Sequence, residues 1–341
     1  MPPRSTVLLV CQLSASFISQ DLNHLRKQFD VIPYNYRGRA HPGFRLVLWM
    51  VRHRKEYDFV LIWFGDVHAT VATTVAFLLR KPSVIVVGGY DASDTPGHGF
   101  LSTAKGRMLA TIHFRACTQI WAVSEALIRQ LGVFRPKLQK KSIHVPVGFD
   151  TGFWIPSDNG PRGSILSVAL AGDWHRAQVK GLDRVVECAR RMPERSFEIV
   201  GVEPSVVPLF GSLPTNLRLL GPMAAEELRA HYQAASVYLQ LSRDEGFGGA
   251  VAEAMASGCI PVVSRVGGLP DLVRDVGFDV DPDDPESVAD AIGTAMQHPE
   301  LRERCRASIM ERFSSERREQ ALAGGIRTLL ARRFSRGQEG I

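Results

Sequence analysis

The sequence predicts an α/β protein with two domains. Short apolar runs of strand character alternate with stretches of strong helix formers, most clearly at residues 237–264. There an apolar run at 237–241 is followed by a glycine-rich turn, a helical stretch at 250–257 and a second apolar run at 260–264. This strand–loop–helix–strand order is half of a nucleotide-binding α/β unit. The chain has 341 residues and single cores stop growing near roughly 250 to 300, so we expect two domains.

The same two patterns place the other elements in order. Apolar runs bounded by turn residues predict strands at 6–11, 59–64, 83–87, 120–123, 165–170, 197–201 and 217–221. Helical patterns occupy 19–29, 68–79, 226–235 and 286–297, and Ser124 is a predicted N-cap. Residues 298–333 are expected to form arginine-rich helices. Their arginines are expected on the solvated surface: Arg317, Arg318, Arg327, Arg332 and Arg333.

Composition excludes several classes of protein. With 45% hydrophobic and 22% charged residues, the chain has the composition of a soluble globular protein. It has no apolar run near twenty residues, and the run at 7–11 is too short for a signal-peptide core, so no membrane span is expected. The five cysteines are scattered and form no C-x-x-C pair, which predicts buried thiols in a reducing compartment: Cys11, Cys117, Cys188, Cys259 and Cys305.

Positive charge is concentrated in the first part of the chain. Residues 1–150 hold 19 Lys and Arg against 9 Asp and Glu, whereas residues 151–341 hold 22 against 26. A basic surface attracts an acidic acceptor, an anionic membrane or nucleic acid. No zinc motif or aromatic-interleaved basic motif supports nucleic acid, so we expect no nucleic-acid partner.

Residues 37–58 combine many cations with apolar side chains around Trp49. One interpretation is an amphipathic basic helix that lies on an anionic membrane. The alternative is a helix that packs Leu48 and Val51 on the sheet and leaves a solvated basic face. The basic residues are Arg37, Arg39, Arg45, Arg52, His53, Arg54 and Lys55.

The glycine-rich turn is the first candidate site. Glu245 lies in the turn and Glu253 follows about two helical turns later, so both can face one ligand. Gly246, Gly248 and Gly249 leave the backbone open to close approach, and the first N–H groups of a helix are unpaired at the positive end of its dipole. A diphosphate fits such a place. The alternative is an ordinary helix-capping loop with Glu253 on a solvated face.

This region resembles the donor-binding core of the retaining glycosyltransferases of family 4 (group 1). The matched elements are Glu-x7-Glu, the Glu-Gly-Phe-Gly turn, Glu-Ala-Met-Ala-Ser-Gly at 253–258 and Pro-Val-Val-Ser-x-Val-Gly-Gly-Leu-Pro at 261–270. The resemblance implies the GT-B fold, with two Rossmann-like domains whose parallel sheets face a central cleft. The expected parts are an acceptor-side domain at 1–150, a hinge at about 150–164, a donor domain at 165–318 and a C-terminal helical segment at 319–341 that can cross back to the first domain.

The resemblance also implies roles for residues of the donor domain. Glu245 would contact hydroxyls of the sugar and Glu253 those of the ribose. Lys180 and an arginine would hold the diphosphate; Asp173 stands at the usual arginine position, so Arg176 or, alternatively, His175 would replace it. The remaining donor-binding positions are Gly246, Phe247, Gly248, Gly249, Ala250, Gly172, Gly221 and Met223.

A further resemblance lies after the predicted strand at 83–87. Family members commonly carry a His-Gly-x-Asp turn here, and its histidine contributes to the active site. Asp91 matches the aspartate, but Gly88 holds the position of the histidine. Asp91 would bind the acceptor or the donor sugar, or cap the following segment.

The resemblance implies a retaining, metal-independent hexosyltransferase without a cofactor. It would move a sugar from a UDP- or GDP-type donor to a hydroxyl of a glycan, lipid-linked or small-molecule acceptor. Cell-envelope glycan or glycolipid synthesis in the cytoplasm or at the inner face of the membrane is the expected setting. The alternative, motivated by the absent histidine and displaced arginine, is a catalytically weak or inactive nucleotide-sugar-binding subunit of a glycan assembly complex. An epimerase or phosphorylase is a third alternative, against which the Glu-Gly-Phe-Gly turn argues.

Overall fold

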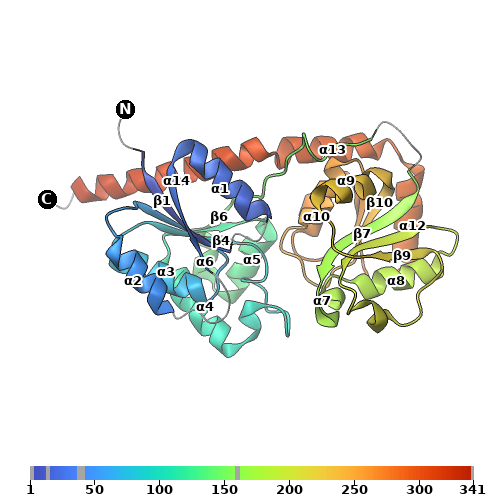
Figure 1. Cartoon of the computed structure of the whole chain (residues 1–341), viewed down its shortest axis with the longest axis horizontal. Coiled ribbons are helices and arrows are strands. Elements are labelled where there is room, and N and C mark those ends of the chain that lie inside the picture. The colour runs from blue at the N-terminus through green and yellow to red at the C-terminus, as the bar shows by residue number, and fades with distance from the viewer. Residues whose placement is uncertain (1–3, 13–15, 37–42, 158–161, 339–341) are drawn as a thin grey trace. The chain divides into compact units, whose positions relative to one another are not determined.

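The computed structural model describes residues 4–12, 16–36, 43–157 and 162–338. The chain divides into two compact units, which we call unit 1 (residues 1–148 and 316–341) and unit 2 (149–315) (Figure 1). Two sequence-based expectations fall partly outside the described residues: the basic stretch at 37–58, at its residues 37–42, and the hinge at about 150–164, at its residues 158–161.

Unit 1 contains a six-stranded parallel sheet with the strand order β2-β1-β3-β4-β5-β6. Its inner strands are fully buried apolar runs because helices cover both faces of the sheet. The strands are β1 (Thr6–Cys11), β2 (Asp30–Asn35), β3 (Phe59–Trp63), β4 (Ser83–Val87), β5 (Gln119–Ala122) and β6 (Ser142–His144).

Two layers of helices cover this sheet (Figure 1). On one face lie α1 (Ser16–Gln28) and α14 (Ser315–Gln338). On the other lie α2 (Gly43–Arg52), α3 (Val67–Leu78), α4 (Ala104–Ala116) and α5 (Glu125–Phe134), followed by the short α6 (Pro136–Lys141). The 3₁₀ helix η1 (Phe100–Ser102) precedes α4, and Ser124 caps α5 as predicted, since its Oγ accepts a hydrogen bond from Leu127 N.

One arginine of α14 is not where the sequence placed it. Arg318 is only 2% exposed, and it pairs with Asp21 of α1. The expectation that Arg318 lies on the solvated surface was therefore wrong. The composition of an arginine-rich helix gives no indication of a partner elsewhere in the chain.

Unit 2 contains a second six-stranded parallel sheet with the order β12-β11-β10-β7-β8-β9. The strand order reverses between β7 and β10, and in open α/β sheets ligands bind outside the carboxyl ends of the strands at such a point. The strands are β7 (Ser164–Ala171), β8 (Phe197–Val202), β9 (Leu217–Leu220), β10 (Ala235–Gln240), β11 (Ile260–Ser264) and β12 (Phe278–Val280).

The helices of unit 2 bury the sheet on both sides. Helix α8 (Leu182–Arg191) and helix α12 (Pro285–Gln297) contact each other and close one apolar core around Ile199, Leu239 and Val262. Helix α10 (Gly249–Ala256) packs against α13 (Leu301–Arg312). The others are α7 (Trp174–Val179), α9 (Ala225–Ala234), α11 (Leu269–Val273) and the 3₁₀ helix η2 (Val207–Phe210).

The prediction of two Rossmann-like α/β sheets is confirmed. All five cysteines are buried free thiols, also as predicted. Among the helices that the structure describes, we find none with the length and apolar character needed to cross a bilayer.

Candidate active site

The loops that follow β7 and β10 touch each other at the strand-order reversal of unit 2. Gly181, which follows α7, has φ +70°, and a Cβ there would lie 1.9 Å from Leu241 O at the end of β10. Only glycine allows this approach without a shift of the backbone. The contact places Lys180, the residue before Gly181, beside the turn that follows β10.

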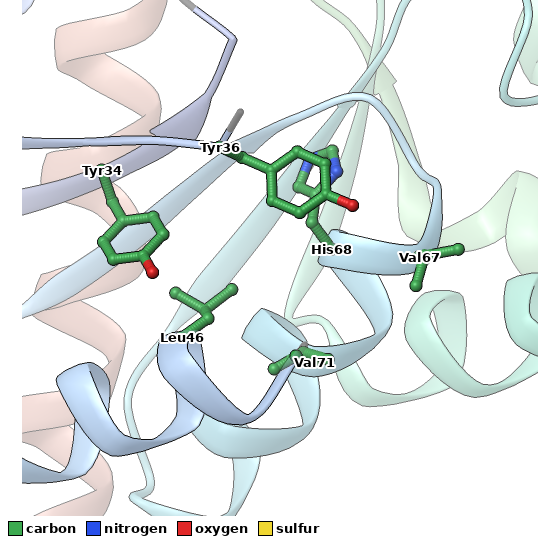
Figure 2. A pocket seen from close by; sticks show the side chains of 7 residues that line it. Tyr34, Tyr36, Leu46, Val67, His68 and Val71 are labelled. Carbon is green, nitrogen blue, oxygen red and sulfur yellow. The ribbon is translucent and has the colours of Figure 1, made fainter. Parts of the chain in front are cut away.

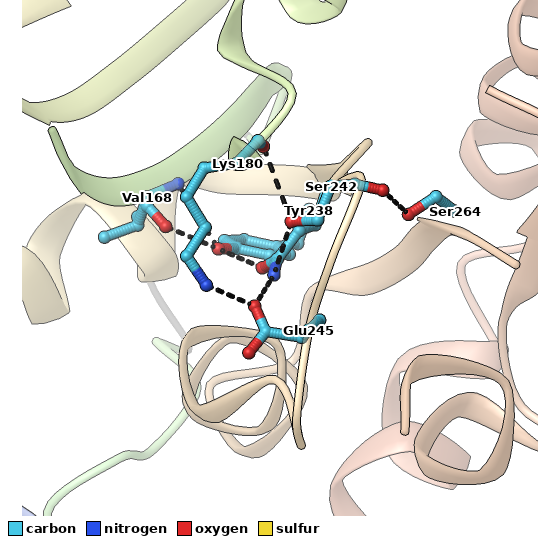
Figure 3. A network of polar contacts seen from close by, with 7 residues as sticks. Val168, Lys180, Tyr238, Ser242, Glu245 and Ser264 are labelled. Atoms are coloured by element: carbon cyan, nitrogen blue, oxygen red, sulfur yellow. Dashed lines mark hydrogen bonds and ion pairs between the residues drawn. The ribbon is translucent and has the colours of Figure 1, made fainter. Parts of the chain in front are cut away.

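Lys180 and Glu245 form the centre of the site (Figure 3). Lys180 Nζ lies 2.6 Å from Glu245 Oε2, and the two side chains are 16% and 13% exposed. Gln240 Nε2 also donates to Glu245 Oε2, at 2.7 Å, and to Ser242 Oγ, at 3.2 Å. Tyr238, whose hydroxyl is 3.2 Å from Gln240 Oε1 and 3.1 Å from Val168 O, ties this network to the sheet. Glu245 is thus held in one orientation by Lys180, which follows α7, and by Gln240 on β10.

Charge at the site favours the ionised form of Glu245. Burial opposes ionisation, but the cations Lys180 and Arg176 and the Gly246 N–H together hold the pKa of Glu245 below its usual value. Arg176 therefore belongs to the same electrostatic cluster. Asp173, at the position where the family's arginine was expected, instead caps α7 by accepting a hydrogen bond from Arg176 N at 2.7 Å. His175 is exposed on the same turn.

The N-terminus of α10 is open toward the same edge. Its N-cap, Gly248, has φ +100° and no capping side chain, and a Cβ there would lie 2.6 Å from Leu269 Cδ2. By contrast, a Cβ on Gly249 would meet no atom within 4 Å. The first N–H groups of α10 thus adjoin open space, with the positive end of the helix dipole.

The C-terminus of α10 is held by two arginines that the sequence analysis did not single out. Arg306 Nη1 donates to Ala256 O at 2.6 Å, and Arg162 donates to Ser257 O at 2.9 Å and Gly258 O at 3.0 Å. Cations at this end complement the helix dipole. Both arginines come from segments distant in sequence, so no local pattern could have identified them.

Glu253 lies on α10, and its carboxylate is largely buried. Glu253 Oε2 accepts a hydrogen bond from the hydroxyl of Tyr232, on α9, at 3.1 Å. Burial raises the pKa of Glu253 to about 7, and the hydrogen bond offsets only part of this effect. Glu253 is thus poised to change its charge near neutral pH.

The remaining donor-site residues fall into two groups. Gly246, Phe247 and Ala250 flank the start of α10. Phe247 is 6% exposed, and its ring stacks on Phe149, with centroids 5.8 Å apart. The exposed Gly172 and Gly221 and the half-buried Met223 follow the carboxyl ends of β7 and β9. All of them lie in unit 2.

Asp91 belongs to unit 1, where its carboxylate is fully buried. It accepts hydrogen bonds from Gly65 N at 2.9 Å, Gly88 N at 3.0 Å and Gly89 N at 2.9 Å. Burial raises the pKa of Asp91 to about 6, against the opposing effect of these N–H groups. The carboxylate therefore ties together the turns that follow β3 and β4.

Phe64 fills the space beside Gly88, where the family's histidine was expected. Phe64 follows β3 and has φ +68°, a left-handed conformation that is uncommon for an aromatic residue. A Cβ at Gly88 would lie only 2.5 Å from Phe64 Cε1. The ring also contacts Phe17 of α1, with centroids 6.2 Å apart. The Phe64 ring thus leaves no room for a side chain at position 88 unless the ring moves.

A shallow pocket of unit 1 opens between the N-terminal ends of α2 and α3 (Figure 2). Tyr34 and Tyr36, at the end of β2, line it, and the ring of His68 lies beside that of Tyr36. The ring centroids of Tyr36 and His68 are 4.9 Å apart. The rest of the lining is apolar: Gly43, Leu46, Val67 and Val71.

The fold of the chain is that of GT-B proteins. The crystal structure of Anabaena HepE in complex with UDP superposes with a TM-score of 0.75 at 17% identity, over 95% of this chain and 100% of that one. Residues 175–312 match the family of glycosyl transferases group 1.

Two curated relatives extend the comparison. A D-inositol 3-phosphate glycosyltransferase of Corynebacterium efficiens is 34% identical over 140 residues, which are 37% of this chain and 33% of that protein. The match thus spans about one third of the relative's length. One subunit of the phosphatidylinositol N-acetylglucosaminyltransferase of Arabidopsis thaliana is 24% identical over 329 residues, 83% of this chain and 73% of the relative.

Proposed function

We propose that the protein transfers a sugar from a nucleoside diphosphate donor to a hydroxyl group, with retention at the anomeric carbon. The observation that carries this proposal is the Lys180–Glu245 pair beside the open N-terminus of α10, at the strand-order reversal of unit 2. The UDP named with HepE favours a uridine donor.

The proposed chemistry is electrostatic. As the bond between the sugar and the diphosphate breaks, negative charge develops on the leaving diphosphate. Lys180, Arg176 and the first N–H groups of α10 would stabilise that charge from fixed positions. Glu245 would orient Lys180 and accept hydrogen bonds from sugar hydroxyls, and Glu253 would accept those of the ribose. These positive groups could replace a divalent cation, so we expect activity to persist in EDTA.

The acceptor is proposed to carry phosphate or a lipid. Two observations support this class: the excess of cations in residues 1–150 and the inositol phosphate and phosphatidylinositol in the names of the two relatives. The proposed setting is the cytoplasmic face of the cell membrane, in the assembly of envelope glycans or glycolipids.

A nucleotide-sugar-binding subunit without turnover is the second candidate. The observation that favours it is the ring of Phe64 at the place expected for an active-site histidine. Such a subunit would bind the donor through unit 2 as described, but it would neither transfer nor hydrolyse the sugar.

Nucleotide binding is the first test of the proposal. A ligand at about 100 times its dissociation constant adds roughly 2.7 kcal/mol to stability, so thermal shifts with UDP, GDP and ADP would identify the base. We expect UDP to stabilise the wild type, Lys180→Met to lose most of this effect and the exposed Arg190→Met to keep it. Stabilisation of the wild type by none of the three nucleotides would contradict a diphosphate site.

Turnover is the second test. Release of UDP from UDP-sugars, with phosphatidylinositol or inositol phosphate as acceptor, should fall about 10²- to 10³-fold in Lys180→Met, the usual loss for one preorganised donor. UDP binding without any turnover would instead favour the non-catalytic subunit.

A further inference from the structure

Unit 1 exposes large apolar side chains on three neighbouring helices of one layer. We call this surface the α2–α4 face; its residues are between 42% and 72% exposed. They are Phe44, Leu48 and Val51 on α2, Phe77 and Leu78 on α3, and Met108 and Ile112 on α4. Exposed apolar residues scattered singly are ordinary, but several on neighbouring helices of one layer indicate an interaction surface.

The orientation of α2 shows that these side chains face outward. Phe44, Leu48 and Val51 are spaced i, i+4 and i+7 and share one side of the helix. Leu46 and Met50 point inward and are 3% and 0% exposed. The alternative in which Leu48 and Val51 pack on the sheet is therefore wrong, and these two residues are free to meet a partner.

The three helices form one continuous layer. Helix α2 packs against α3, and α3 packs against α4, as Figure 1 shows. The pocket of Figure 2 opens at the edge of this layer, where Gly43 precedes Phe44. The apolar residues of the three helices thus belong to one face of unit 1.

The charges on this face and beside it are mostly positive. Helices α2 to α4 carry five Lys and Arg and no acidic residue, and the acidic Asp66 caps the start of α3. Arg54 and Lys55 follow α2 and are exposed, with the acidic Glu56 next to them. The face therefore presents apolar side chains among cations, the pattern of surfaces that bind at the boundary between anionic headgroups and acyl chains.

We propose that the α2–α4 face docks on an anionic phospholipid bilayer. Phe44, Leu48 and Phe77 would enter the headgroup region while the surrounding cations meet lipid phosphates. A second copy of this chain would bring the same excess of cations to the contact, which disfavours self-association through this face. The proposal deepens the proposed function by assigning its membrane partner to named residues, but docking itself requires neither nucleotide nor turnover.

Vesicle binding tests the proposal directly. The full-length protein is sedimented with vesicles of phosphatidylcholine alone or with about 30% phosphatidylglycerol, at low and at high salt. We expect binding only to the anionic vesicles and a decrease at high salt. Absence of binding to phosphatidylglycerol vesicles at low salt would overturn the proposal.

Matched variants locate the surface. The variant Phe44→Ser/Leu48→Ser/Phe77→Ser should lower vesicle partitioning by at least about tenfold. The control, Leu170→Ser/Leu209→Ser/Met310→Ser, removes three equally exposed apolar residues from unit 2 and should bind as the wild type does. Equal binding by the two triple variants would overturn the assignment to the α2–α4 face.

Charge reversal tests the second component of the face. Arg52→Glu/Lys55→Glu should weaken binding to anionic vesicles and reduce its salt dependence, whereas Arg190→Glu/Arg191→Glu on α8 should not. Each variant is also titrated with UDP. Unchanged UDP affinity with lost vesicle binding would support the docking surface, whereas failure of all proteins, including the wild type, to bind UDP would count against the proposed function alone.

Discussion

Arg318 and Asp21 form a buried ion pair that fastens the C-terminal helix to unit 1. Arg318 donates from Nε and Nη2 to the two carboxylate oxygens of Asp21, at 2.9 and 2.6 Å, and the side chains are 1% and 3% exposed. Arg318 Nη1 also donates to Val145 O at 2.7 Å, and Trp63 Nε1 donates to Asp21 Oδ2 at 2.9 Å. One pair thus connects α14, α1, β3 and the segment after β6.

Removing one partner of this pair should be strongly destabilising. Arg318→Met leaves the carboxylate of Asp21 buried without its cation, a loss of about 3–5 kcal/mol in the free energy of unfolding. The double variant Arg318→Met/Asp21→Leu should recover part of it, because no buried charge remains. Urea unfolding measures the stability of both variants. The control is Arg274→Met, which removes an exposed ion pair with Asp271 and should lower the free energy of unfolding by about 1 kcal/mol or less. A double variant as unstable as the single one would contradict this account.

The inner strands of both sheets could be predicted from the sequence because they are buried on both faces. The predictions for β1, β4 and β11 agree with the structure at both ends, since continuous apolar runs mark such strands. The edge strands β2 and β12 were not predicted. Strand β2 is partly exposed and contains Pro33, and β12 has only three residues. Neither of these two strands has the continuous apolar run of an inner strand, whereas the edge strand β9 was predicted from its run at 217–221.

For the site, the sequence indicated the residues that a local motif contains. The segments that hold Glu245, Lys180 and the glycines around Phe247 follow β7 or β10 in the chain. They therefore lie at the carboxyl ends of these two neighbouring strands. The supporting residues come from elsewhere in the chain. Arg318 lies 297 positions from Asp21, and Arg306 lies 50 from Ala256. Long-range partners of this kind leave no periodic pattern in the sequence.

Nucleotide affinity should depend on pH through Glu253. The pKa of its buried carboxyl is raised to about 7, and hydrogen bonds from ribose hydroxyls would favour the ionised form. Protonation therefore competes with the ligand, and UDP should bind about tenfold more weakly at pH 6 than at pH 8. Calorimetric titration of the wild type and Glu253→Gln measures this, and the variant corrects for titration of UDP itself. The same pH dependence in both proteins would exclude Glu253 as its source.

Substitution by alanine should have different effects on stability and UDP binding at two glycines beside the site, Gly249 and Gly267. A methyl group at Gly249 meets no protein atom, so Gly249→Ala should leave stability unchanged or raise it by up to about 1 kcal/mol. If a diphosphate approaches the backbone there, the same methyl group should weaken UDP binding. At Gly267, with φ +53°, a Cβ would lie 1.7 Å from Glu245 O, so Gly267→Ala should reduce both stability and binding. Thermal melts with and without UDP distinguish them. Wild-type UDP affinity in Gly249→Ala would show that the ligand does not approach this backbone.

Introducing a histidine at position 88 should destabilise the protein as long as the Phe64 ring keeps its position. The imidazole of Gly88→His would compete with the Phe64 ring for the same space, and overpacking of this kind costs about 1–3 kcal/mol. Phe64→Gly removes the ring and relieves a left-handed backbone that costs on the order of 1 kcal/mol. The double variant should therefore be more stable than the sum of the two single changes predicts, which urea unfolding of all four proteins measures.

The matched control for this cycle is Gly324→His on α14, where a Cβ meets no atom within 4 Å and no loss of stability is expected. UDP release is then compared between the double variant and Phe64→Gly. A faster release in the double variant would show that a histidine at position 88 increases turnover. Full stability of Gly88→His alone would mean that the Phe64 ring moves aside at little cost. In that case steric exclusion by Phe64 would not explain why this chain carries glycine at position 88.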